Sequence, residues 1–285
     1  MLVLWSSLTV SLVHPVLDAP NVLTVKLPRC GTAMRRAKEH FDVAVRPHLE
    51  AGLIEALEEQ PLPCRSLRHD THGNFFVMKG GSSTDPAKSK SSDLAWISVD
   101  DLATWQTFRE IFEETGVAEA VASLISPLHQ RVQLYSSFYV VRSHCTDANW
   151  HADWPEGTGT SAWTLLAPLE RYETADFQLL YKDCKGAVHQ YRYEEGEAIL
   201  FGSHFMHSTE PGRARRGAAE PHAFLCFTFG RGSRLHSALP LVTRAHLSTP
   251  PDPPESLECA YAPPKCSLGH PRAQEGAVQL LSSRR

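Results

Sequence analysis

The chain has 285 residues, of which 42% are hydrophobic and 21% charged, and its formal net charge is −4. This length accommodates one substantial core with appendages, and the near-neutral charge gives no reason to expect a nucleic-acid or membrane partner. Seven scattered cysteines without a C-x-x-C pair argue against a fully paired disulfide framework and favour a reducing, cytoplasmic location.

The first hundred residues are predicted to be a mixture of helices and short strands. The run 1–13 is apolar, but it has no basic region before it and no clear cleavage site after it, so we interpret it as a strand or leader remnant. Helices are predicted over 33–45 and 49–57, on either side of Pro47. A short strand at 75–78 and the polar loop GGSSTDPAKSKSS follow.

The next predicted helix begins near Asp101 and ends at Gly116. Ser98 to Asp101 offers a variant of the capping box, in which the acid at the third helical position reaches back. A second, shorter helix over 117–125 is stopped by Pro127. The apolar residues of the first helix recur at helical spacing, as expected for a face packed on a sheet: Leu102, Trp105, Phe108, Ile111 and Phe112.

From residue 131 the apolar periodicity changes from helical to alternating. The first predicted strand places these residues on one face: Val132, Leu134, Ser136, Phe138 and Val140. Further strands are predicted at 162–167, 177–181, 188–193, 198–201 and 223–229, with a hairpin turn at 182–186. Many short strands after a helical lead-in predict a mainly β protein, a jelly roll or barrel with helices packed outside it.

Three regions are expected along the chain. Residues 1–130 form a lead-in of helices and strands that packs on the core, and residues 131–235 form the β core. Residues 236–285 are rich in proline and lack periodicity, which predicts a disordered or loosely attached tail.

A candidate metal site is formed by His151-Ala-Asp153 and the distant His207. On an extended strand, residues i and i+2 point to the same face, so His151 and Asp153 can bind one ion together. Two histidines and a carboxylate are the ligand set of a non-haem Fe(II) site and leave three positions of an octahedral ion open. His204 is the main rival for the third ligand, but three residues before His207 it would point to the opposite face of a strand.

These motifs resemble the iron(II)- and 2-oxoglutarate-dependent dioxygenases over about residues 130–230. The resemblance rests on His151-Ala-Asp153, on an apolar strand that follows the turn Gly196-Glu197, and on the sequence HSTEPG that begins at His207. Prolyl-hydroxylase-like members of the family look nearest. The resemblance implies a double-stranded β-helix core of the jelly-roll or cupin kind, with Fe(II) bound by His151, Asp153 and His207.

The resemblance also implies the reaction. The co-substrates would be 2-oxoglutarate and O2, with ascorbate as an optional reductant, and the products succinate and CO2. The expected activity is hydroxylation of an unidentified small-molecule or protein substrate. The alternative is a catalytically inactive or structural metal-binding jelly-roll protein that binds a partner.

The family uses a basic residue for the distal carboxylate of 2-oxoglutarate, about ten residues after the last ligand. That position here is Gly217, so the sequence departs from the family pattern, which favours the inactive alternative. The nearby candidates are Arg213, Arg215, Arg216 and His222. Arginine offers a two-pronged bond to a carboxylate, and Arg213 is favoured among the three; His222 directly precedes a strand.

Other strands hold further candidates for contact with the co-substrate. Tyr135, Tyr139 and Arg142 lie on the strand that leads to the site and are candidates for hydrogen bonds to a co-substrate, and Tyr135 is predicted to contact 2-oxoglutarate. Should none of the basic residues after His207 bind the carboxylate, Arg142 and Lys182 are the remaining cations to test.

Overall fold

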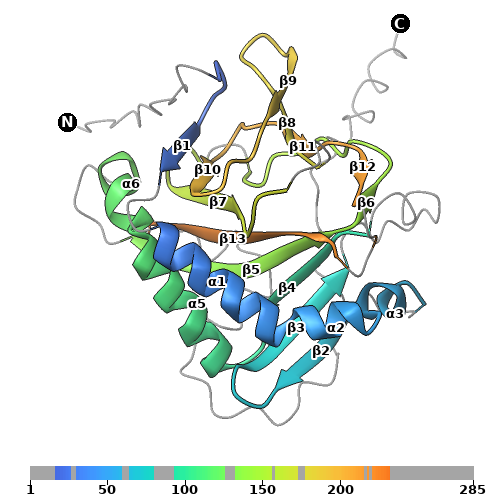
Figure 1. Cartoon of the computed structure of the whole chain (residues 1–285). Coiled ribbons are helices and arrows are strands. Elements are labelled where there is room, and N and C mark those ends of the chain that lie inside the picture. The colour runs from blue at the N-terminus through green and yellow to red at the C-terminus, as the bar shows by residue number, and fades with distance from the viewer. Residues whose placement is uncertain are drawn as a thin grey trace, which may run out of the picture.

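The computed structural model describes residues 17–26, 30–59, 64–79, 93–125, 132–155, 158–172, 177–214, 217 and 220–231. The predicted run 1–13, the loop over 80–92 and the tail over 236–285 lie outside these residues. The architecture is mainly β, with helices against one face of a large sheet (Figure 1). In this part of the chain, none of the helices has the length and hydropathy needed to cross a membrane.

The helices predicted over 33–45, from about Asp101 to Gly116, and over 117–125 are confirmed, whereas the helix predicted over 49–57 is replaced by two short ones, Arg46–Glu50 and Leu53–Glu59. Pro47 occupies the first turn of a helix, where its missing N–H costs nothing, so it restarts the helical path and does not break it. Two long helices, α1 and α5, lie side by side against one face of the large sheet (Figure 1). The helices are α1 (Cys30–Ala44), α2 (Arg46–Glu50), α3 (Leu53–Glu59), α5 (Leu102–Thr115) and α6 (Val117–Ile125).

The predicted capping box at the start of α5 is wrong. Asp101 is itself the N-cap, with an extended backbone, and its carboxylate accepts a hydrogen bond from the Thr104 amide at 2.8 Å. Ser98 instead belongs to a strand that the sequence did not reveal, and its hydroxyl donates to the Ser137 carbonyl at 2.9 Å. Gly116 ends α5 in the left-handed conformation, as predicted.

The strands form one large sheet and two small ones. The large antiparallel sheet has the order β1-β10-β7-β13-β5-β4-β3-β2, and the small sheets are β11-β8-β9 and β12-β6. The strands are β1 (Val22–Lys26), β2 (Cys64–His69), β3 (Gly73–Lys79), β4 (Ala95–Val99), β5 (Val132–Arg142), β6 (His144–Cys145), β7 (Ala162–Pro168), β8 (Leu179–Lys182), β9 (Val188–Tyr191), β10 (Glu197–Phe201), β11 (His207–Thr209), β12 (Gly212–Arg213) and β13 (His222–Arg231).

From β5 onward the chain passes back and forth between the large sheet and the small ones. Strands β5, β7, β10 and β13 lie in the large sheet, while β6, β8, β9, β11 and β12 lie in the small sheets facing it. This alternation is the path of a double-stranded β-helix, so the predicted jelly-roll core is confirmed. The strands before β5 extend the large sheet at its two edges.

The larger hydrophobic core fills the space between the helices and the large sheet. Its fully buried side chains include Phe41 of α1, Phe108 of α5, Tyr139 of β5 and Phe227 of β13. Each such side chain contributes about 1.5–3 kcal/mol when removed from water. A smaller cluster lies inside the β-helix and includes Tyr181, Phe201 and Phe205. The first core holds the sheet in place; the second lies next to the candidate site.

The alternation of β5 is interrupted by a bulge that the sequence did not predict. Thr228 of β13 pairs with Ser136, but the next residue, Phe229, pairs with Leu134, which leaves Tyr135 as the extra residue. Tyr135 therefore leaves the face expected of it and joins Trp154 and Ala162 in a separate small cluster.

A buried histidine links α1 to β5. The His40 side chain is 4% exposed, and its Nδ1 atom lies 2.9 Å from the hydroxyl of Tyr139. Burial, and then the charges of His72, Arg36 and His69, lower the pKa of His40 to about 4. The folded protein therefore resists protonation of His40, whereas the unfolded chain accepts a proton near pH 6.5.

We predict that this histidine makes folding sensitive to mild acid. Between pH 6.5 and 4, His40 is protonated in the unfolded chain and neutral in the folded protein. The free energy of unfolding therefore falls as pH falls through this window. His40→Gln should remove the effect. Urea titrations of the metal-free protein at pH 7 and 4.5 should show the wild type losing roughly 2–3 kcal/mol more than the variant. Equal losses would contradict this assignment.

Candidate metal centre

The first two predicted ligands come from a loop and not from a strand. His151 and Asp153 lie after β6, and the prediction that an extended strand carries both is wrong. A single antiparallel bridge replaces the strand: the His151 amide donates to the His207 carbonyl at 3.0 Å, and the His207 amide donates to the His151 carbonyl at 2.9 Å. His207 begins β11 and pairs with Tyr181 of β8. Backbone hydrogen bonds therefore place the two histidines together.

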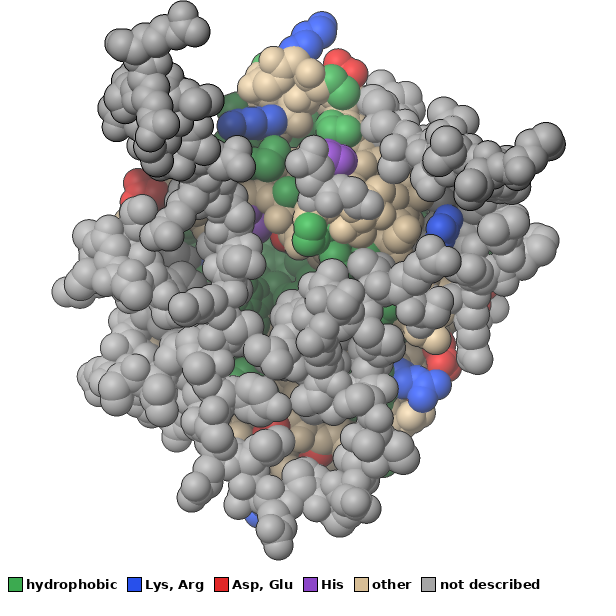
Figure 2. Space-filling model, turned by 180° about the vertical axis from the view of Figure 1, so that it is seen from behind, with side chains coloured by type: hydrophobic (Ala, Val, Ile, Leu, Met, Phe, Trp, Pro, Cys, Tyr) green, Lys and Arg blue, Asp and Glu red, His purple; other side chains and the backbone are tan. Residues whose placement is uncertain are grey.

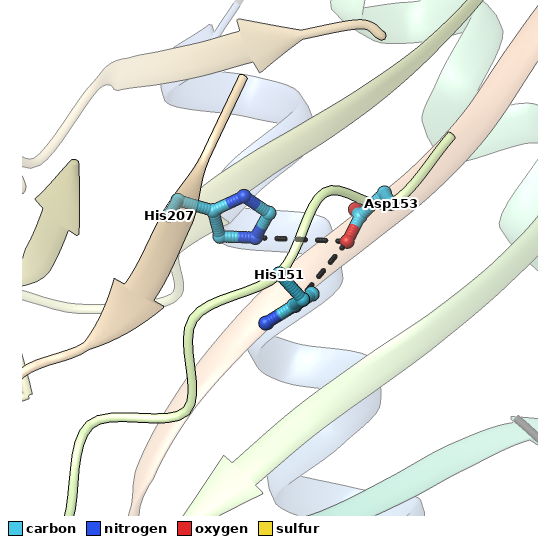
Figure 3. Close-up of side chains that lie close together, drawn as sticks. All are labelled: His151, Asp153 and His207. Atoms are coloured by element: carbon cyan, nitrogen blue, oxygen red, sulfur yellow. Dashed lines mark ion pairs between the residues drawn. The ribbon is translucent and has the colours of Figure 1, made fainter. Parts of the chain in front are cut away.

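The structure brings the three predicted ligands to one point (Figure 3). Their ligand atoms all lie within 4.8 Å of one another. Asp153 Oδ1 is 3.4 Å from His151 Nε2 and 3.6 Å from His207 Nε2. These separations suit three ligands around one ion, which would sit between them at a bond length of about 2 Å from each.

Backbone carbonyls select the tautomer of both histidines. His151 Nδ1 lies 2.8 Å from the Asn149 carbonyl oxygen, and His207 Nδ1 lies 3.1 Å from the Phe205 carbonyl oxygen. A carbonyl only accepts, so each Nδ1 carries the proton and donates it. Each Nε2 then has a free lone pair facing Asp153, which is the arrangement that metal-binding imidazoles require.

The charges of the cluster prepare it for a cation. Burial alone would raise the pKa of Asp153, but the neighbouring histidines and a hydrogen bond from Thr164 lower it to about 2. Burial lowers the pKa of His207 to about 4, so its imidazole is neutral at pH 7. Burial also opposes protonation of His151, but Asp153 outweighs it and the pKa of His151 is raised. The site therefore offers an ionised carboxylate and a neutral His207.

His204, the rival for the third ligand, differs from His207 in exposure and backbone conformation. It is exposed and occupies a turn with a left-handed backbone, φ 67°, whereas His207 is buried. It does not belong to the described group of residues whose ligand atoms converge. Figure 2 shows a recess near the centre of the face opposite to that of Figure 1, with hydrophobic side chains at its bottom.

Aromatic side chains surround the ligands. The ring of Phe201 lies 4.5 Å from that of His207, Phe205 stacks on His207 at 5.6 Å, and the two phenylalanine rings are 5.3 Å apart. Beside His151, the ammonium group of Lys182 lies over the ring of Trp150 at 4.8 Å. The apolar rings next to His207 exclude water from that side of the site.

The structure places the predicted 2-oxoglutarate contacts at different depths. Arg213 is exposed on β12, opposite His144. His222 is buried at the start of β13 and stacks on Tyr172, with 3.9 Å between ring centroids. The Tyr135 hydroxyl donates to the Arg231 carbonyl at 2.7 Å, so its proton is already in use. Arg215 and Arg216 lie outside the described residues. These five assignments remain predictions.

A cation that the sequence analysis named only as an alternative anchor lies inside the β-helix. Arg142 ends β5 directly opposite His222, and its Nε is sealed from solvent without a hydrogen-bond partner among the described residues. Burial lowers the pKa of this guanidinium, while Cys145, Asp93 and Tyr193 act against that shift. Arginine stays charged nonetheless. Arg142 lies on the same face of β5 as Phe138 and Val140, the face toward the interior. A charged residue at an interior position of a predicted strand is the sequence signal for this cation.

Thr164 is a residue of the site that the sequence analysis missed. It lies in the middle of β7, is 2% exposed, and donates its hydroxyl proton to Asp153 Oδ2 at 2.9 Å. The indole N–H of Trp154 donates to the same hydroxyl at 3.1 Å. A lone hydroxyl in an otherwise apolar predicted strand was the signal that could have drawn attention to it.

Comparisons with known proteins identify structural likeness only. No protein-family model and no curated protein matches the chain. AviO1 from Streptomyces viridochromogenes Tue57 is 9% identical over 75% of this chain and 90% of its own, with a TM-score of 0.47. HygX from Streptomyces hygroscopicus, solved with nickel, 2-oxoglutarate and hygromycin B, is 13% identical over 57% of this chain and 85% of its own, with a TM-score of 0.38.

A third structure is SnoN, described as a non-heme alpha-ketoglutarate-dependent epimerase from nogalamycin biosynthesis. It is 11% identical over 74% of this chain and 76% of its own, with a TM-score of 0.44. At these identities, and with TM-scores below 0.5, the likenesses carry no argument about function. The function has to come from the residues of the site.

Proposed function

We propose that the chain is an Fe(II)- and 2-oxoglutarate-dependent oxygenase that hydroxylates a small-molecule or protein substrate. The observation that carries this proposal is the convergence of His151 Nε2, His207 Nε2 and one oxygen of Asp153. Two neutral imidazoles and a carboxylate on one side of an ion are the ligand set of non-haem Fe(II) oxygenases. Bound there, Fe(II) with 2-oxoglutarate and O2 supplies the oxidising power for C–H hydroxylation, releasing succinate and CO2.

The chain's own residues fit both the metal and a dicarboxylate. Asp153 supplies the negative charge, and the carbonyls of Asn149 and Phe205 hold the imidazoles in the binding tautomer. The β-helix interior also contains the half-buried cation Arg142, whose Nε is sealed from solvent without a hydrogen-bond partner among the described residues, which is costly. A carboxylate bound there would remove that cost, and the missing cation after His207 no longer favours the inactive alternative.

The first test is whether 2-oxoglutarate binds and reacts only through the metal. Calorimetry under argon should show 2-oxoglutarate binding to the Fe(II)-loaded protein and not to the metal-free protein. In air, the loaded protein should release succinate slowly even without a primary substrate. Asp153→Ala should lose both signals. A metal-loaded wild type that neither binds 2-oxoglutarate nor releases succinate would establish the alternative, a structural metal-binding jelly-roll protein.

The finer assignments remain proposals. The prolyl-hydroxylase-like subfamily, the use of ascorbate and the cytoplasmic location are proposed from the sequence alone. An active enzyme makes the substrate testable, because coupled turnover raises succinate release above the uncoupled rate.

A further inference from the structure

We infer that Thr164 and Trp154 form a positioning pair that holds Asp153 as a one-oxygen ligand and so keeps three metal positions open. The inference rests on the metal site of the proposed function and concerns how this chain shapes it. The Trp154 indole N–H donates to Thr164 Oγ1 at 3.1 Å, and Thr164 Oγ1 donates to Asp153 Oδ2 at 2.9 Å. The other oxygen, Oδ1, faces both histidines.

The direction of these hydrogen bonds follows from their chemistry. An indole N–H can only donate, so the Thr164 hydroxyl must accept from Trp154. Its single proton is then left for the carboxylate, which has only acceptors. A bond to an ionised carboxylate is stronger than one between neutral groups. Asp153 would have to break it before Oδ2 could turn toward the ion.

The sheet makes this support rigid although Asp153 lies in a loop. Thr164 pairs with Phe201 of β10 on one side and with Thr228 of β13 on the other, in the middle of the large sheet. Trp154 is 7% exposed, and its ring packs edge-on against Tyr135. Ligands on loops are placed less exactly than ligands on strands, and a fixed second partner compensates for this.

The consequence is a particular number of free metal positions. With Asp153 bound through Oδ1 alone, three of six octahedral positions are filled, which leaves two for a chelating 2-oxo acid and one for O2. Without the Thr164 bond, Asp153 can turn and bind through both oxygens. One open position would then be lost. Thr164 therefore acts on the reaction through Asp153 and is a positioning residue.

The test compares metal affinity in matched variants. Thr164→Val removes the hydroxyl at nearly constant volume, Thr164→Ser keeps it, and Thr228→Val makes the same change at the neighbouring strand position, where the hydroxyl contacts Ser136 and not Asp153. Calorimetry with Co(II) alone, a redox-stable probe, should show about 10–100-fold weaker binding for Thr164→Val. Thr164→Ser and Thr228→Val should bind Co(II) within about threefold of the wild type, well inside that range.

Two further measurements separate positioning from folding. The visible absorption of bound Co(II) depends on its coordination, so its shape should change in Thr164→Val and stay unchanged in Thr228→Val. Trp154→Phe, which keeps the ring and removes the N–H, should weaken Co(II) binding in the same direction by a smaller factor. The Co(II) affinity of Trp154→Phe also tests the inference if Thr164→Val does not fold.

Several outcomes would overturn the inference. These are wild-type Co(II) affinity in Thr164→Val, equal losses in Thr164→Val and Thr164→Ser, or wild-type affinity in Trp154→Phe. None of these measurements uses 2-oxoglutarate or turnover. A wild type that binds Co(II) but releases no succinate would therefore reject the proposed oxygenase activity and leave the positioning role of Thr164 standing.

Discussion

His207→Ala is expected to abolish stoichiometric metal binding while leaving a folded protein. The variant loses the Nε2 atom that lies 3.6 Å from Asp153 Oδ1, which leaves only His151 and Asp153 as ligands. The fold should survive, because His207 contributes to the bridge with His151 and to β11 through its backbone, which alanine retains. Metal content after gel filtration and calorimetry with Fe(II) under argon measure the loss, and circular dichroism verifies the fold.

His204→Asn is the matched control for that variant. His204 is three residues earlier, exposed, and left-handed at φ 67°, a conformation that asparagine tolerates. The His204→Asn variant should bind one metal ion with wild-type affinity. If His204→Asn loses the metal and His207→Ala keeps it, the third ligand has been assigned to the wrong histidine.

The second large effect is expected for Arg142→Gln, which should weaken 2-oxoglutarate binding about ten- to hundredfold. Hydrogen bonds to charged groups are worth about 1.5–3 kcal/mol, and Arg142 is a cation inside the β-helix whose sealed Nε has no hydrogen-bond partner among the described residues. Metal affinity should stay the same, because Arg142 is not a ligand. Calorimetry with 2-oxoglutarate on the Co(II)-loaded protein gives the affinity, and a titration with Co(II) alone gives the control value.

Stability distinguishes this role from a structural one. Replacing Arg142, whose Nε has no hydrogen-bond partner among the described residues, should leave the melting temperature unchanged or raise it, whereas breaking a structural ion pair costs several kcal/mol. Arg213→Gln serves as the comparison, since Arg213 is an exposed arginine on β12. A loss of 2-oxoglutarate affinity in Arg213→Gln with none in Arg142→Gln would return the anchor to the loop after His207, where the sequence placed it.

The sequence by itself determined the elements whose signals are local. Helical spacing from Leu102 to Phe112 predicted α5, and Gly116 predicted its end, because both depend on neighbouring residues only. The hairpin between β8 and β9 was predicted from its turn for the same reason. The His-x-Asp spacing with a later histidine also identified the three residues that converge, since their chemistry is recognisable without coordinates.

Short strands and the strand bulge could not be predicted this way. Strands β6, β11 and β12 are two or three residues long, too short to show any periodicity. The bulge at Tyr135 is defined by pairing with β13, whose residues lie some ninety positions later in the chain. The alternation along β5 alone predicts the same two faces over the whole strand, so it cannot locate the residue at which the faces change.

The tertiary structure alone decided how the site is built. His151 and Asp153 are held without a strand of their own, by a bridge to His207 and a hydrogen bond from Thr164. Arg142 lies opposite His222 because of the register in which β5 and β13 pair from His222 to Thr228. Each of these contacts joins residues from different strands or loops. Local periodicity reports the backbone conformation of one segment, whereas the register between segments depends on packing that only the folded chain contains.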